Sequence, residues 1–346
     1  MKVLPETELK ERLLAAACET WGTDAAELEI RQLRQLHGGV SSLTYLAEVE
    51  NTPQGDASWV VKIAPPGLAP VRNRDVLRQS RLMHYIRQQN SVPVPHILLE
   101  SDGSPPLFVM EYLPGQSYEP LLDEDDDPPA PQVVTQRAFA AARALAEMQS
   151  LETRELHTTD RVIQITDELE RWAKLLTTVP DEIVPRHDEL YRALTQHVPR
   201  DLEPVLVHGD FRLANMLFSG PQLNGIIDWE IWSLGDPRID LAWLIMHNAP
   251  AHRFVAHRSE TDQLAGTGMP SAEDLLEQYS SAGGTAENVE LDWFLGYSYY
   301  KVASTLSVIV KRNLENLEQQ PHLAVAAQSL PDVVSRGLDA MERLSS

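Results

Sequence analysis

The chain has 346 residues, of which 43% are hydrophobic and 23% are charged, as in ordinary globular proteins. Its 51 acidic and 29 basic residues give a net charge of −22. A field of that sign repels nucleic acid and anionic membranes, so neither is an expected partner. We find no apolar stretch near the ~20 residues of a membrane helix, and the polar N-terminus lacks a secretory signal's apolar core. These features predict a cytoplasmic location.

The first third of the sequence has the pattern of a small sheet with helices. Residues 6–20 predict an amphipathic helix, which contains Cys18, the only cysteine. We expect the Cys18 side chain to be buried. Residues 72–90 predict a second helix, which ends at the following Val-Pro-Val-Pro because proline cannot continue a helix. Five segments have the composition of strands: 28–33, 43–49, 58–63, 96–100 and 106–112.

The remainder of the chain is mainly helical in pattern. Helices are expected at 132–150, 160–178, 184–196, 271–282, 289–313 and 322–344. A strand-rich island at residues 205–228 interrupts them, and Pro237 suits the first turn of a further helix. By itself this pattern predicts two lobes of the α+β class.

The island at 205–228 contains a group of polar residues that suits phosphoryl transfer. Asp210 follows one apolar strand, and Asp228 ends the next. Asn215 and Asp228 offer the oxygen ligands that Mg²⁺ prefers. Asp210 can orient an attacking hydroxyl and accept its proton. Arg212, two residues later, can reach a phosphate oxygen. The alternative is a loop whose polar side chains only cap one another.

Two further polar residues, downstream of the island, are expected to have structural roles. Asp240 is expected to brace the loop, and Asp236 is expected to cap the helix that follows it. We assign Trp243 to the hydrophobic core.

The spacing His-x-Asp-x-x-x-x-Asn, followed by a strand that ends in Asp, matches a kinase catalytic loop. With Gly209 between His208 and Asp210, it resembles the aminoglycoside phosphotransferase family. The continuation through Asp-Trp-Glu and Gly-Asp-Pro-x-x-Asp-Leu-Ala is similar to a subgroup related to the kinase-like domain of some acyl-CoA dehydrogenases. The resemblance spans residues 28–312. It implies a structural role for His208, which would bond the backbone around the loop rather than move protons.

This resemblance implies a bilobal, protein-kinase-like fold. Residues 1–112 would form a small N-terminal nucleotide-binding lobe, with a helix and a five-stranded antiparallel sheet. Residues 113–346 would form a larger, mainly helical lobe with the catalytic loop and the acceptor site. It also implies an ATP- and Mg²⁺-dependent small-molecule kinase, a phosphotransferase with an alcohol group as acceptor.

Nucleotide-binding residues are likewise implied by the resemblance. Lys62, late in its strand, would contact the α- and β-phosphates. Backbone groups from Glu111 to Leu113 would bind adenine, and because such contacts are made by backbone, ATP and GTP both remain open. The loop before the second strand would cover the phosphates through Gly38, Gly39, Ser41 and Ser42.

One position departs from the family pattern. The helix after the lysine strand normally carries a glutamate that pairs with the lysine, and here Gln79 aligns with it. Glutamine can bond the ammonium group but cannot neutralise it. Either the alignment slips and Gln79 is not the equivalent residue, or the protein handles ATP weakly. A catalytically weak or inactive pseudokinase that binds nucleotide is therefore the second hypothesis.

The acceptor stays open among aminoglycosides, amino alcohols and hydroxyacyl-CoA compounds. The acidic run 123–127 favours an amine-bearing substrate, although such runs are also ordinary solvated loops. The subgroup signature favours a hydroxyacyl thioester. A CoA ester is anionic and needs a local basic patch. The sequence does not indicate an oligomeric state.

Overall fold

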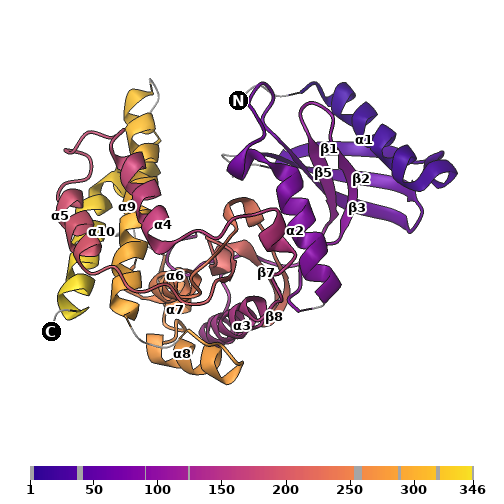
Figure 1. The fold of residues 1–346 in the computed structure, drawn as a ribbon. Helices are drawn as coiled ribbons and strands as arrows, with labels where there is room; N and C mark the ends of the chain where they lie inside the picture. The colour runs from indigo at the N-terminus through magenta and orange to yellow at the C-terminus, as the bar shows by residue number, and fades with distance from the viewer. Residues whose placement is uncertain are drawn as a thin grey trace. The chain divides into compact units, whose positions relative to one another are not determined.

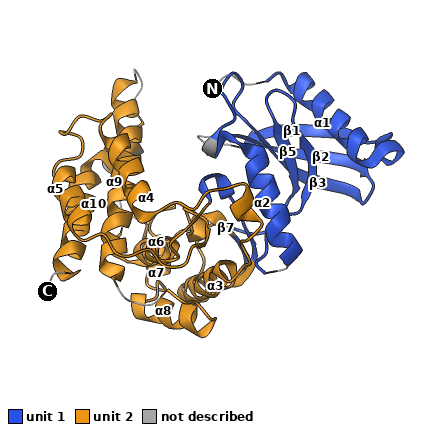
Figure 2. Ribbon diagram, viewed as in Figure 1, with its two compact units in different colours: residues 1–116, 217–219, 224–232 blue, residues 117–216, 220–223, 233–346 orange. Residues whose placement is uncertain are grey.

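The computed structural model describes residues 4–36, 42–89, 91–123, 125–252, 259–286, 290–316 and 320–344 (Figure 1). The chain divides into two compact units, coloured separately in Figure 2. Unit 1 comprises Met1–Gln116, Leu217–Ser219 and Asn224–Trp232. Unit 2 comprises Ser117–Met216, Gly220–Leu223 and Ser233–Ser346.

Unit 1 is built on a five-stranded antiparallel sheet, which confirms the predicted sheet of the N-terminal lobe. The strands lie in the order β1-β2-β3-β5-β4. Lys62 of β3 is paired with Thr44 on one side and with Phe108 on the other. The strands are β1 (Glu29–Leu36), β2 (Leu43–Thr52), β3 (Gly55–Ile63), β4 (Ile97–Ser101) and β5 (Leu107–Glu111).

Two helices accompany this sheet. Helix α1 (Glu6–Trp21) shares a buried apolar cluster with Val61 and Trp59 of β3. Successive strand residues point to opposite faces, so Lys62 projects from the face opposite Val61. Helix α2 (Val76–Gln89) supplies the side chain that meets Lys62 there. The sheet therefore separates α1 from the polar side chains of the site.

The prediction that Cys18 is buried is wrong, because its side chain is exposed. Helix α1 buries Leu9, Leu13, Ala16 and Ala17, which share one helical face. At about 100° per residue, position 18 falls on the opposite side of the helix from the centre of that face. An apolar run of consecutive residues cannot all face the sheet.

Unit 2 is mainly helical, as predicted. Helix α6 (Arg238–Asn248) begins directly after Pro237, and α7 (Glu260–Gly266) was not expected. A small sheet of unit 2 pairs β6 (Val205–Val207) with β9 (Ser233–Gly235). A second small sheet pairs β7 (Met216–Ser219) with β8 (Gln222–Ile226), and most of its residues belong to unit 1. The other helices are α3 (Pro131–Gln149), α4 (Ile165–Leu176), α5 (His187–Gln196), α8 (Ala272–Ser281), α9 (Leu291–Glu315) and α10 (Pro321–Leu344).

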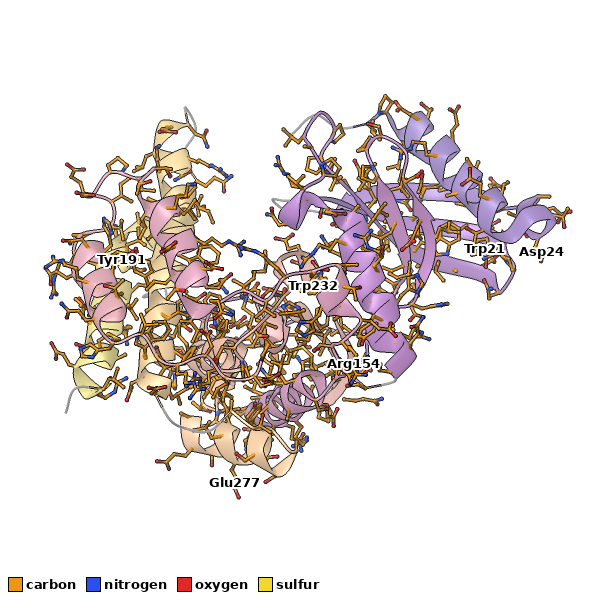
Figure 3. The ribbon with its side chains drawn as sticks, in the orientation of Figure 1. Trp21, Asp24, Arg154, Tyr191, Trp232 and Glu277 are labelled. Atoms are coloured by element: carbon orange, nitrogen blue, oxygen red, sulfur yellow. The ribbon has the colours of Figure 1, made fainter. Side chains whose placement is uncertain are left out.

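One apolar core holds the C-terminal helices together. It contains residues of α4, α5, α6, α9 and α10, with Trp293 and Tyr297 fully buried. Tyr191 of α5, labelled in Figure 3, stacks on Tyr300 of α9 at a centroid distance of 5.9 Å. In the described part of the chain, no helix is both long and apolar enough to cross a bilayer.

Candidate active site

Lys62 in unit 1 has two polar neighbours. Its Nζ lies 2.5 Å from Asp228 Oδ1 and 3.5 Å from Gln79 Oε1. The Lys62 side chain is largely buried, whereas that of Asp228 is 38% exposed. Two residues that are 166 positions apart in sequence, and that were predicted to serve phosphates and metal, thus form one ion pair.

The backbone at Asp228 is left-handed. Its φ of 65° and ψ of 55° lie in a region that residues other than glycine seldom occupy, although Asp tolerates it better than most. Such conformations cluster at functional sites. The segment after Asp228 is held to α2, because the Arg78 guanidinium stacks on the Trp232 ring at 3.8 Å and donates to the Trp232 carbonyl at 3.1 Å. Trp232 is labelled in Figure 3.

Gln79 lies beside Lys62, as the alignment predicts. Its side chain is 2% exposed, and its Oε1 accepts a long bond from Lys62. Its Nε2 is buried and has no hydrogen-bond partner in the described part of the chain. Because an amide carries no charge, Asp228 alone supplies the counter-charge for Lys62 in unit 1.

The segment predicted to bind adenine continues from β5. The amide of Glu111 donates to the His96 carbonyl at 2.9 Å, and that of Tyr112 donates to the Ser58 carbonyl at 3.2 Å. The amides of Glu111 and Tyr112 are thus already bonded, and the residue after Leu113 is proline, which has no amide hydrogen. Leu113 is therefore the residue of this segment whose amide hydrogen is offered to a ligand.

The predicted phosphate-covering loop is largely outside the described residues. Gly38, Gly39 and Ser41 belong to this undescribed stretch. Ser42, at the start of β2, is described and is 2% exposed.

Asp210 in unit 2 is held by three donors. Trp243 Nε1 donates to its Oδ1 at 2.8 Å, and Asn215 Nδ2 donates to its Oδ2 at 2.7 Å. Arg212 Nε approaches the same two oxygens at 3.1 and 3.4 Å. The side chain nevertheless remains 27% exposed. The carboxylate is fixed in orientation and still open to another molecule.

Charge around Asp210 favours its ionised form. Burial alone would raise the pKa of Asp210, but the positive charges of Arg212 and Lys301 outweigh burial and lower that pKa below its usual value. An ionised carboxylate can accept a hydrogen bond from a hydroxyl group and can then accept its proton.

Arg212 joins Asp210 to a buried glutamate that the sequence analysis missed. Arg212 Nη1 donates to Glu119 Oε2 at 2.7 Å, and the Glu119 side chain is 2% exposed. Burial raises the pKa of Glu119, and the Arg212 charge opposes this. No local sequence motif marks position 119 as a partner of Arg212, because the two residues are 93 positions apart.

The loop that carries Asp210 is braced from α6. Asp240 is fully buried, and its carboxylate accepts the amides of His208 at 2.6 Å and of Gly209 at 2.9 Å. The amide of Asp210 donates to His208 Nδ1 at 3.2 Å. These contacts confirm the structural roles expected for Asp240 and His208. Trp243 is buried as predicted, and its bond to Asp210 gives it a second role.

The two predicted metal ligands each offer an oxygen of the kind that Mg²⁺ prefers. The Asn215 side-chain amide group donates to the Asp210 main-chain oxygen at 2.8 Å and to the Asp210 carboxylate at 2.7 Å. The side-chain oxygen of Asn215 therefore points away from Asp210. Asp228 adds a half-exposed carboxylate. The described residues hold no cluster of three His, Cys, Asp or Glu side chains that would form a closed metal site. Few protein oxygens, completed by water and phosphate, are typical for Mg²⁺.

A comparison with protein families decides the assignment. The model of the phosphotransferase enzyme family matches residues 32–275. The chain belongs to this family. The match includes Lys62, Asp210, Asn215 and Asp228.

Individual relatives agree with this family. Mouse acyl-CoA dehydrogenase family member 10 is 27% identical over 316 residues, which cover 86% of this chain but only 28% of that protein. A Ralstonia eutropha crystal structure assigned to the aminoglycoside phosphotransferases has a TM-score of 0.75 and 21% identity, and covers 96% of this chain and 98% of its own. A complex of streptomycin, ATP and APH(2")-IIa has a TM-score of 0.54 and 20% identity, with coverages of 96% and 99%. The chain thus spans well under half the length of the first relative.

Proposed function

We propose that the protein is a phosphotransferase that moves the γ-phosphate of ATP to a hydroxyl group of a small molecule. The observation that carries the proposal is Asp210, which three donors hold in place while its carboxylate remains accessible. The family match and the ATP complex of a structural neighbour support the choice of nucleotide.

In the proposed reaction, Asp210 accepts a hydrogen bond from the acceptor hydroxyl and aims its oxygen at the γ-phosphorus. A bond forms between that oxygen and phosphorus, the bond from phosphorus to the ADP oxygen breaks, and the hydroxyl proton passes to Asp210. Positioning and charge neutralisation provide most of the rate gain in such transfers. Arg212 keeps Asp210 aligned and ionised.

The nucleotide contacts are assigned to residues of unit 1. Lys62 binds the α- and β-phosphates, and the Leu113 amide and the Glu111 backbone bind adenine. Gly38, Gly39, Ser41 and Ser42 cover the phosphates. Asn215 and Asp228 would hold Mg²⁺, which when bound neutralises the phosphate charge.

Two acceptor classes remain, each with its own support. The likeness to an acyl-CoA dehydrogenase family member favours a hydroxyacyl thioester such as a hydroxyacyl-CoA. The acidic run near Asp125 and the likeness to a streptomycin complex favour a cationic aminoglycoside or amino alcohol. Arg212 and Lys301 are cations near Asp210, and they disfavour a positively charged group close to the reacting hydroxyl.

A nucleotide-binding pseudokinase is the second candidate, and Gln79 is the observation that favours it. ATP consumption with Mg²⁺ is to be measured across aminoglycosides, choline-like amines, hydroxy amino acids, sugars and hydroxyacyl-CoAs, in parallel with nucleotide binding by calorimetry. Acceptor-dependent turnover supports the enzyme and identifies its substrate class. Tight Mg-nucleotide binding with no transfer supports the pseudokinase, and the absence of nucleotide binding refutes both.

A further inference from the structure

Helix α9 carries a buried lysine that the proposed reaction does not use. The Lys301 side chain is in the middle of α9, and the residue is 3% exposed. Removing an ammonium group from water is costly unless the protein supplies a replacement for the lost hydration. In the described part of the chain, no carboxylate oxygen lies within ion-pair distance of Lys301 Nζ. Ordinary salt-bridge formation therefore does not account for its burial.

The closest partners of Lys301 are instead a carbonyl and an aromatic ring, while a second ring, that of Trp172, lies farther away with its centroid 5.6 Å from Nζ. Its Nζ donates a hydrogen bond to the Gly209 carbonyl. The same nitrogen lies 4.0 Å from the centroid of the Trp243 ring, a distance that suits a cation–π interaction. Desolvation lowers the pKa of Lys301, while the nearby acidic groups Asp210, Glu168 and Asp240 oppose that shift.

Both partners adjoin Asp210. Gly209 precedes it in sequence, and Trp243 donates to its carboxylate at 2.8 Å. The Gly209 amide donates to Asp240 at 2.9 Å, and the Gly209 carbonyl accepts from Lys301, so both main-chain polar groups of this residue are held. These bonds matter because Gly209 has a φ of 85°, which allows the chain to turn sharply into Asp210.

We propose that Lys301 is a positioning residue for phosphoryl transfer. By holding the Gly209 carbonyl and the Trp243 indole together, its ammonium group fixes the direction of the Asp210 carboxylate. The inference rests on the proposed function, since it assigns Lys301 to the same reaction. It concerns orientation of the catalytic loop and leaves nucleotide binding to other residues.

The direct variant is Lys301→Met, which removes the charge and nearly preserves the length of the side chain. Lys311→Met is the matched control, because Lys311 lies on the same helix and also donates to a backbone carbonyl, that of Thr178 at 2.8 Å. A misdirected catalytic group costs on the order of 10²-fold in rate. We expect kcat of Lys301→Met to fall about 10- to 100-fold, with KM for ATP nearly unchanged, and we expect the control to retain wild-type values.

A second variant tests the route of the effect. Trp243→Phe keeps an aromatic ring but removes the hydrogen bond to Asp210. If Lys301 acts through Trp243 and Gly209, the losses of Lys301→Met and Trp243→Phe combine less than additively in the double variant. Full additivity would show that Lys301 does not act through the indole, and would overturn that part of the proposal.

Hydrogen–deuterium exchange provides a readout that needs no substrate. In Lys301→Met we expect faster exchange at residues 207–212 than in the wild type, with no such change in Lys311→Met. Unchanged loop exchange in a folded Lys301→Met protein, or equal loosening throughout α4, α6 and α9, would overturn the proposal. If Met at this position prevents folding, Lys301→Gln is measured in the same way. A wild-type protein that transfers no phosphate would refute the proposed function. The exchange data would still show whether Lys301 orders residues 207–212.

Discussion

Glu119 is a buried charge that contacts Arg212 directly although the two residues are 93 positions apart in sequence. Its carboxylate is enclosed, and its Oε2 accepts hydrogen bonds from Arg212 at 2.7 Å and from the Ala214 amide at 3.4 Å. Its other oxygen, Oε1, is buried without a hydrogen-bond partner in the part of the chain that the structure describes. Glu119 and Asp210 therefore share one guanidinium, so the loss of either carboxylate leaves Arg212 with one partner fewer.

Glu119→Gln tests this arrangement at the residue scale. The variant keeps the shape but removes the buried negative charge, so the Arg212 guanidinium loses one of its two carboxylate hydrogen-bond partners among the described residues. We expect the free energy of unfolding to fall by about 1–3 kcal/mol, measured by urea titration, together with a several-fold loss of phosphotransferase activity. Wild-type stability and wild-type activity together would show that Glu119 has no such role.

Gln79 allows a second test at this scale. A glutamate at position 79 would give Lys62 a buried counter-charge in addition to Asp228. Charge-assisted bonds are about twice as strong as neutral ones, so Gln79→Glu is expected to hold Lys62 more firmly and to lower KM for ATP. Gln79→Leu is the control that removes the side-chain oxygen. A KM that rises equally in both variants would contradict the assignment of Gln79 to the position of the usual glutamate.

At the scale of elements, α6 organises the loop that carries Asp210. Asp240, Trp243 and His247 are three and four residues apart and so lie on one face of the helix. Asp240 binds the loop amides, Trp243 binds Asp210, and His247 packs on Trp243 at a ring distance of 4.6 Å. His247 Nδ1 lies 3.0 Å from the Trp243 carbonyl, which can only accept, so this nitrogen carries the hydrogen.

The same face predicts a sensitivity to acid. Burial, aided by the charge of Arg212, lowers the pKa of His247 from 6.5 to about 3, and burial also places the pKa of His252 well below 6.5. Between those values the unfolded chain binds protons that the folded protein does not. Stability contributed by the neutral histidines is therefore present above pH 6.5 and is lost as the pH falls toward 3, by up to about 1.4 kcal/mol per pH unit for each histidine.

His247→Asn is expected to reduce this acid sensitivity. Asparagine can still donate to the Trp243 carbonyl but does not titrate in this range. Urea unfolding at several pH values between 4 and 7.5 should show a pH slope that is smaller by about one proton. Because both proteins share all their other titrating groups, an identical slope in the variant would contradict the assignment.

At the scale of the whole molecule, sequence reasoning succeeded where the signal was local. Hydrophobic periodicity located the five strands around Lys62 and most of the helices, and the run from His208 to Asn215 forms one loop whose polar side chains contact Asp210. The predicted roles of Lys62 and Asp228 stay predictions, although the structure brings the two side chains together in an ion pair.

The missed residues depend on tertiary structure. Lys301 meets Gly209 across 92 positions, and Glu119 meets Arg212 across 93. Neither lysine nor glutamate has a local pattern that distinguishes a buried partner from a solvated one. Trp243 was predicted as core and is indeed buried, but its bond to Asp210 depends on how α6 packs against the loop. The prediction that Cys18 is buried failed because the apolar sequence around it did not reveal which face of α1 meets the sheet.

The central claim is that Asp210 directs phosphoryl transfer to an alcohol, and the most direct test is to follow the phosphorylated product itself. Wild-type protein, Asp210→Asn and the exposed control Asp102→Asn are to be incubated with Mg-ATP and the acceptor that the screen identifies, with the product quantified by mass spectrometry. We expect the rate for Asp210→Asn to fall about 10²- to 10⁴-fold, with nucleotide binding retained and the control unaffected. Product formation by Asp210→Asn at the wild-type rate would contradict the account.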